Sequence, residues 1–263
     1  MATRRQIGSE AWQALSKTGT NHLFVISGLH VGMVASLIYK ILSLLAFSSA
    51  SRSIATLFAT GAYAAIAGWG LPVQRAFVMT AVVVVGTSLQ RNISVATMFF
   101  SALFAVLIIE PFAVLNIGFW LSFAAVFSLL YAFSGRVPLV SNWLISSVRS
   151  QWVVYIGMLP WMLYLLHQLS WISWVVNLAA IPWIGLLAVP MVLVTIVSSF
   201  FTISIASLGL TLCSQLLNLA WAVIDWFAQW NFVHYSAPPT LVLLSVAMIG
   251  VLALLAPRGL LPK

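Results

Sequence analysis

The chain has 263 residues, of which 63% are hydrophobic and 5% are charged. This composition excludes an ordinary water-soluble domain and is typical of an integral membrane protein. The formal net charge of +8 comes from 11 Lys and Arg against 3 Asp and Glu. Such an excess has two explanations, a polyanionic partner or basic residues beside membrane spans, and the second is favoured because the basic residues cluster outside the apolar runs.

In chain order, apolar stretches separated by short polar breaks predict about nine membrane-spanning helices. The breaks have local causes, such as the Ser-rich segment 48–53 and the Glu110-Pro111 pair. The fold class predicted is all-α, a polytopic transmembrane helical bundle in which Pro and Gly break some spans. The predicted spans are Leu23–Phe47, Ile54–Trp69, Val73–Leu89, Ile93–Ile109, Phe112–Phe133, Trp152–Leu166, Trp171–Phe200, Ile203–Trp230 and Thr240–Leu255.

The first span carries an unusual number of small and polar residues. Gly28, Gly32 and Ser36 repeat every four residues, a spacing that favours close packing of a second helix. Ser27 and His30 are three residues apart and share a neighbouring face of the same predicted helix. An ionisable side chain within a span marks a functional site by default, because an unpaired polar group in hydrocarbon is costly.

Two further places predict irregular helices. Pro72 opens a span with Arg75 one turn later, and the longest apolar run contains Asn177, Pro182 and Pro190. Helix breaks at membrane depth need protein or water to satisfy the freed backbone groups. These residues therefore indicate cavity walls, with a simple kink or a re-entrant segment as the alternative.

Catalytic and metal chemistry find little support. The sequence has no His-x-x-x-His or Cys-x-x-Cys pattern, and the four histidines are widely spaced. Ser27 and His30 lack the glycine that a Gly-x-Ser-Gly nucleophile motif needs, since position 25 is Val. We expect no metal, no cofactor and no enzymatic activity in this chain.

Four collinear motifs carry a family resemblance. They are Gly19-Thr-Asn-His-Leu23 running into Ile26-Ser-Gly-Leu-His-Val-Gly32, Pro72-Val-Gln-Arg-Ala76, Gly118-Phe-Trp-Leu-Ser-Phe-Ala124, and Asn177-Leu-Ala-Ala-Ile-Pro182. Together they resemble the competence domain of the ComEC family, inner-membrane DNA-uptake channels of naturally competent bacteria. The resemblance implies a short polar segment at 1–22, a ComEC-type transmembrane domain at 23–256 and a tail at 257–263.

The resemblance also implies the function: passage of one DNA strand through the bundle during transformation, in a bacterial inner membrane. Implied partners are single-stranded DNA, membrane lipids, a periplasmic DNA receptor and a cytosolic helicase-like motor. Full-length relatives carry an oligonucleotide-binding-fold region and a metallo-β-lactamase-like nuclease domain, and neither is in this sequence. We expect a stand-alone domain, a truncated product or an excerpt, and these three remain open.

A DNA strand carries a charge at every phosphate, so it crosses a bilayer only along a hydrated path with few carboxylates. The hypothesis is that His22, Ser27, His30, Arg75 and Asn177 face this path. Two alternatives remain: a small-solute or lipid-linked permease of the same fold, and a remnant that transports nothing.

Overall fold

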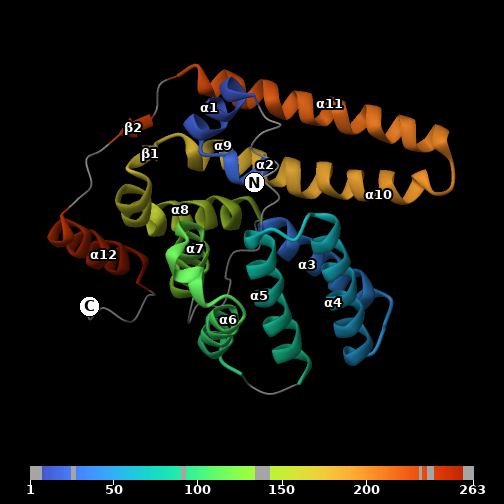
Figure 1. The fold of residues 1–263 in the computed structure, drawn as a ribbon, viewed down its shortest axis with the longest axis horizontal. Helices are drawn as coiled ribbons and strands as arrows, with labels where there is room; N and C mark the ends of the chain where they lie inside the picture. Colours follow the sequence, from blue (N-terminus) through green and yellow to red (C-terminus); the bar gives the residue numbers. More distant parts are fainter. Residues whose placement is uncertain are drawn as a thin grey trace. The chain divides into compact units, whose positions relative to one another are not determined.

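A computed structural model describes residues 8–24, 28–89, 93–133, 143–230, 233–235 and 240–256 of the chain (Figure 1). These residues form twelve α-helices, a few 3-10 and π-helical turns and two strands of three residues each. The predicted all-α class is therefore confirmed. Strand β1 is Gln168–Ser170 and strand β2 is Val233–Tyr235, and the two pair with one another.

The chain divides into two compact units. Unit 1 consists of Met1–Val25 and Ser170–His234, and unit 2 consists of Ile26–Leu169 and Tyr235–Lys263. The first division falls between Val25 and Ile26, inside the first motif. The two halves of that motif therefore belong to different units.

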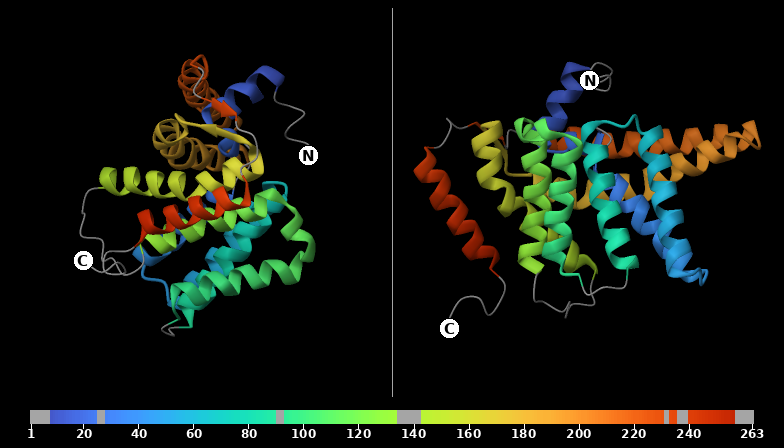
Figure 2. Two further views of the ribbon diagram at one scale, coloured as in Figure 1. Left: turned by 90° about the vertical axis from the view of Figure 1, so that its left-hand side faces the viewer. Right: turned by 60° about the horizontal axis from the view of Figure 1, so that its bottom comes forward.

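Unit 1 contains five α-helices: α1 (Ser9–Thr18), α2 (Asn21–Phe24), α9 (Ser173–Pro182), α10 (Val189–Ser199) and α11 (Ile203–Ala228). Helices α10 and α11 pack side by side over much of their length (Figures 1 and 2). They approach each other closely at Gly209, where an added Cβ would overlap the hydroxyl of Thr195. A buried cluster of Leu15, Val176 and Ile224 joins α1, α9 and α11.

Unit 2 contains seven α-helices: α3 (Gly28–Leu44), α4 (Ser49–Ile66), α5 (Leu71–Ser88), α6 (Val95–Ile109), α7 (Ile117–Phe133), α8 (Trp143–Trp161) and α12 (Leu241–Leu255). Helices α3, α4 and α5 pack against one another, and α7 packs against α8. A 3-10 helix, Pro111–Leu115, joins α6 to α7. The buried residues Val106, Ala113, Phe119 and Phe123 form the core of this turn.

The helix ends follow local rules. The hydroxyls of Ser48, Ser94 and Thr240 accept backbone N–H bonds at the starts of α4, α6 and α12. Pro160 and Pro182 lie inside helices, and each is followed by a π-helical segment, Met162–Leu166 and Trp183–Ala188. Each proline lacks the N–H that would bond the carbonyl four residues earlier, so each interrupts the α-helical hydrogen bonds.

A helix occupies each of the nine stretches that the sequence predicts as spans. Within the described ranges, however, only Leu71–Ser88, Ser173–Ile196 and Ile203–Ala228 are both long and apolar enough to cross a membrane. Three helices in the described ranges therefore have the length and composition of a membrane span, and the predicted count of nine is not confirmed.

Two predicted spans differ in their bounds from the helices. The sequence predicts a first span over Leu23–Phe47, where the structure assigns α2 to Asn21–Phe24 and α3 to Gly28–Leu44, with residues 25–27 outside the described ranges. It predicts another span from Trp152, whereas α8 already begins at Trp143. The apolar run of the first span is continuous in sequence, and hydropathy alone does not reveal that its beginning packs in another unit. His30 is consequently the third residue of α3 rather than lying two turns inside a longer helix.

Candidate functional site

The side chain of Arg75 is buried within unit 2, with only 4% of its surface exposed. It lies near the start of α5, where Gly70 is the N-cap residue and Pro72 occupies the first turn. Proline suits this position because its missing N–H has no helical acceptor there. The Pro72-x-x-Arg75 spacing thus places a cation just inside a helix that is long enough to span a membrane.

The guanidinium of Arg75 lies against the beginning of α7. A Cβ atom added to Gly118 would be 3.0 Å from Nη2 of Arg75 and 3.1 Å from Oδ1 of Asn116. The amide oxygen of Asn116 accepts a hydrogen bond of 2.8 Å from the backbone N–H of Gly118. Glycine at position 118 therefore makes the space that the arginine occupies, and the second and third motifs meet at this contact.

Glu110 lies close to the side chain of Arg75. A small cavity of about 10 Å³ is lined by Arg75 and Glu110 together with Gln74, Val78, Val106 and Ile109. Its size is close to the minimum for one water molecule, and its polar groups suit one. Among the described residues, no direct ion pair joins the two charges, and Nε and Nη1 of Arg75 have no hydrogen-bond partner. The cation is thus near a carboxylate but retains two uncommitted donors.

The second half of the first motif packs on the second motif. A Cβ atom added to Gly28 would be 2.9 Å from Cβ of Ala76 and 3.2 Å from the carbonyl oxygen of Pro72. The beginning of α3 therefore lies directly against the beginning of α5. His30, two residues further along α3, is also buried, with 5% of its surface exposed.

The predicted small-residue row is not uniform in its surroundings. Gly28 makes the close approach just described, but a Cβ added to Gly32 would meet nothing within 4 Å, and Ser36 is exposed. The tight packing lies at the first turn of α3 and not along the whole row.

The first half of the first motif packs on the fourth motif, within unit 1. Leu23 is buried in a cluster with Ala180 and Ile184, on and just beyond α9. Gly19 has a positive φ of 70°, and an added Cβ would be 2.6 Å from Cβ of Ser173. The hydroxyl of Ser170 donates a 2.6 Å hydrogen bond to the carbonyl of Lys17. The four motifs thus form two separate meeting places, one in each unit.

The structure places the other residues predicted to face the DNA path as follows. His22 is exposed, and its Nδ1 lies 3.0 Å from the carbonyl oxygen of Gly19. Asn177 is partly buried on α9, and its Oδ1 has no hydrogen-bond partner among the described residues. Ser27 lies outside the described residues. The structure therefore brings His30 and Arg75 into unit 2 and leaves His22 and Asn177 in unit 1.

Sequence reasoning did not include Glu110, Asn116 or Gly118 among the site residues. The available signal was the rarity of acids, since Glu110 is one of 3 in the chain and directly precedes a proline between apolar runs. Within the described residues no group of three or more His, Cys, Asp or Glu gathers that could hold a metal. The expectation of no metal remains a prediction.

Comparison with known proteins identifies the family. Residues 1–259 match the family described as Competence protein. The chain belongs to the competence protein family. The resemblance that the four motifs carry is thereby confirmed.

Curated relatives agree with the competence family assignment. The chain is 36% identical over 257 residues to Competence protein ComA of Neisseria gonorrhoeae, covering 95% of this chain and 36% of that protein. It is 28% identical over 271 residues to ComE operon protein 3 of Bacillus subtilis (strain 168), covering 98% of this chain and 34% of that one. It thus spans about a third of these relatives' length. No solved structure matches the chain.

Proposed function

We propose that this competence-family chain forms part of a multi-pass channel in a bacterial inner membrane that admits single-stranded DNA during natural transformation. Support comes from the family, from relatives whose names refer to competence, and from the scarcity of acids. In this proposal the shorter apolar helices α3, α6, α7 and α12 cross the membrane together with the three longer ones. A periplasmic DNA receptor and a cytosolic motor are the proposed partners.

The observation that carries the proposal is the burial of Arg75. A charged side chain in a membrane-embedded helix is costly, by about 2.5 to 3.5 kcal/mol at the helix centre on insertion scales and by less near a helix end, and it marks a functional site by default. Glu110 near the same cavity offsets part of this cost, but Nε and Nη1 remain without partners. Guanidinium donors of this kind bind phosphate oxygens strongly. Arg75 is therefore the residue that we expect to contact the DNA backbone.

The two cavities described in unit 2 are too small for DNA to pass through the structure in this conformation. The one beside Arg75 holds about 10 Å³ and a second, apolar one holds about 230 Å³. Neither is a conduit for a nucleotide chain as it stands. The proposal therefore requires the surroundings of Arg75 to open during transport. His22, Ser27, His30 and Asn177 remain candidates for the same path.

The test measures labelled DNA that reaches the cytoplasm of a transformable host expressing the protein with whatever further domains its gene encodes. We expect R75A to lower uptake about tenfold or more, because the phosphate contact is lost, and R75K to retain part of it. H30A tests the second buried candidate. R52A is the matched control, since it removes one cation from α4, where Arg52 stacks on Tyr39.

Normal uptake in R75A, at unchanged protein level in the membrane, would remove Arg75 from the path. The permease alternative makes a different forecast. Purified protein in liposomes would then carry a small solute at a rate that added DNA does not change.

A further inference from the structure

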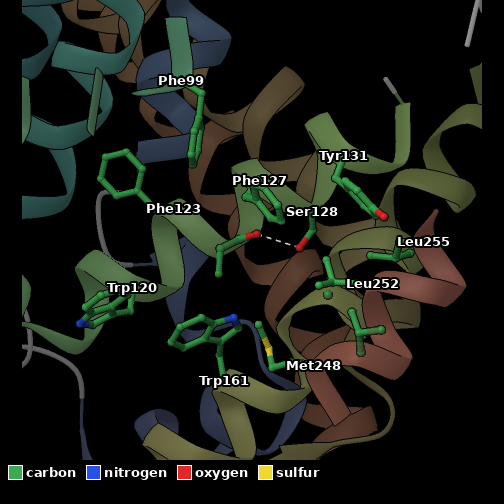
Figure 3. A pocket seen from close by; sticks show the side chains of 13 residues that line it. Phe99, Trp120, Phe123, Phe127, Ser128, Tyr131, Trp161, Met248, Leu252 and Leu255 are labelled. Atoms are coloured by element: carbon green, nitrogen blue, oxygen red, sulfur yellow. Dashed lines mark hydrogen bonds between the residues drawn. The ribbon is translucent and has the colours of Figure 1, made fainter. Parts of the chain in front are cut away.

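A second cavity in unit 2 lies away from the buried arginine. It holds about 230 Å³, opens on one side and is lined by residues of α6, α7, α8 and α12 (Figure 3). Its α7 wall is a single helix face that includes Trp120, Phe123, Phe127 and Tyr131, spaced three or four residues apart. Eleven residues of helix extend over about 16 Å. The cavity is therefore elongated along α7, and we call it the aromatic groove.

Small residues form the bottom of the aromatic groove and tryptophans close one end. An added Cβ at Gly157 of α8 would overlap the side chain of Ser128, so α7 and α8 approach closely there. At one end, the rings of Trp120 and Trp161 stack with centroids 5.7 Å apart and planes inclined by 12°. Met248, Val251 and Leu252 of α12 also line the groove, and Met248 lies beside Trp161 (Figure 3).

The lining determines what can bind in the aromatic groove. Among the described residues that line it there is no Lys, Arg, His, Asp or Glu, and the hydroxyl of Ser128 already donates to the carbonyl of Ala124 over 2.7 Å. With so few polar groups in the lining, most of a nucleobase's polar edge would have no partner, at substantial cost. A hydrocarbon chain has no polar edge.

A cation lies beyond the end of the aromatic groove that is formed by Tyr131 and Leu255. Arg149, on the second turn of α8, stacks over the ring of Phe133 at 4.8 Å from its centroid. Phe133 packs against a cluster that includes Leu255 of the groove wall. Arg149 forms no ion pair within the described part of the chain and precedes the apolar stretch that begins at Trp152. It is therefore placed to meet a lipid phosphate.

We infer that the aromatic groove binds one acyl chain of a membrane phospholipid, whose phosphate is held by Arg149. The hydrocarbon occupies the apolar length between α7 and α12, and the guanidinium of Arg149 supplies a positive charge at its end. This lipid site is independent of the DNA path, since it uses neither Arg75 nor Glu110.

The experiment uses the full chain, washed free of loosely bound lipid in detergent and then supplied with phosphatidylglycerol, diacylglycerol or oligothymidylate. Native mass spectrometry counts what each chain retains. We expect one retained phosphatidylglycerol per chain and about tenfold less in L252W, whose indole fills the groove. The matched control is I249W, which adds the same ring to α12 at a residue that is 67% exposed and does not line the groove.

A second variant tests the headgroup part without altering the groove. R149Q should abolish the preference for phosphatidylglycerol over diacylglycerol while the chain remains folded by circular dichroism. Equal lipid retention in wild type, L252W and I249W would overturn the inference, as would no retention by wild type. Retention of oligothymidylate in place of lipid, lost in L252W, would instead make the groove a surface for stacking bases.

Discussion

Gly118 lies against the guanidinium of Arg75, and the space that a Cβ atom would take at position 118 is within 3.0 Å of Nη2. This single contact joins two sequence motifs on different helices, α5 and α7. It also gives the guanidinium room, because the neighbouring helix has no side chain at position 118.

We expect G118A to displace Arg75 and to destabilise the protein by about 1 to 3 kcal/mol, the usual cost of overpacking. Thermal unfolding in detergent measures the stability, and labelled DNA uptake measures the function. The control is G32A in α3, where an added Cβ meets nothing within 4 Å. Alanine in a helix interior should stabilise that position by about 0.5 to 1 kcal/mol. Equal stability of G118A and wild type would show that Arg75 does not need the space.

Arg75 and Glu110 should be energetically coupled through the cavity that they share. E110Q alone leaves the cation without its nearby carboxylate, and R75Q alone leaves the carboxylate without its cation. We expect each to destabilise the protein and the double variant to cost less than the sum, with a coupling of about 0.5 to 3 kcal/mol. A double-mutant cycle on unfolding free energies measures this. Additive effects would show that the two charges act independently.

Gly19 combines two constraints, a positive φ of 70° and a close neighbour in Ser173. G19A should therefore destabilise unit 1 by more than the cost of backbone strain alone, which is about 1 to 2 kcal/mol. Gly68 provides the comparison, since it has a φ of 88° but nothing within 4 Å of an added Cβ. G68A should therefore lower the stability only by the cost of backbone strain at a positive φ. If both variants lose the same stability by thermal unfolding, the contact with Ser173 is unimportant.

The contact between α3 and α5 at Gly28 can be tested by a compensating change. G28A brings two methyl groups into conflict, because Cβ of Ala76 is 2.9 Å from the new atom. We expect G28A to be less stable than wild type and the double variant G28A/A76G to recover part of the loss. Recovery should be incomplete, since the carbonyl oxygen of Pro72 stays 3.2 Å away. A double variant no more stable than G28A would contradict this packing.

Much of the fold follows from the order of apolar residues. Each predicted span contains a helix because runs of about 20 apolar residues between Pro, Gly and Ser breaks leave few other solutions. The motifs around His30, Arg75, Gly118 and Asn177 were enough to identify the family. Both inferences depend on local patterns, which a single sequence displays directly.

What could not be predicted is which helix packs on which. Periodicity places Gly28 and Gly32 on one face but does not say that α5 covers only the first of them. Nothing local to Gly118 indicates that an arginine from another helix fills the space beside it. The division between the units at Val25 and Ile26 is not visible in the sequence, because hydropathy continues unchanged across it.

The position of Arg75 affects how the protein is made. Helix α5 precedes α6 and α7 in the chain, so it is synthesised before the residues that will surround its cation exist. Near the start of a helix, a long side chain can extend toward water at the bilayer surface until then. Enclosure of the guanidinium must therefore come late in biogenesis, after α7 has been inserted.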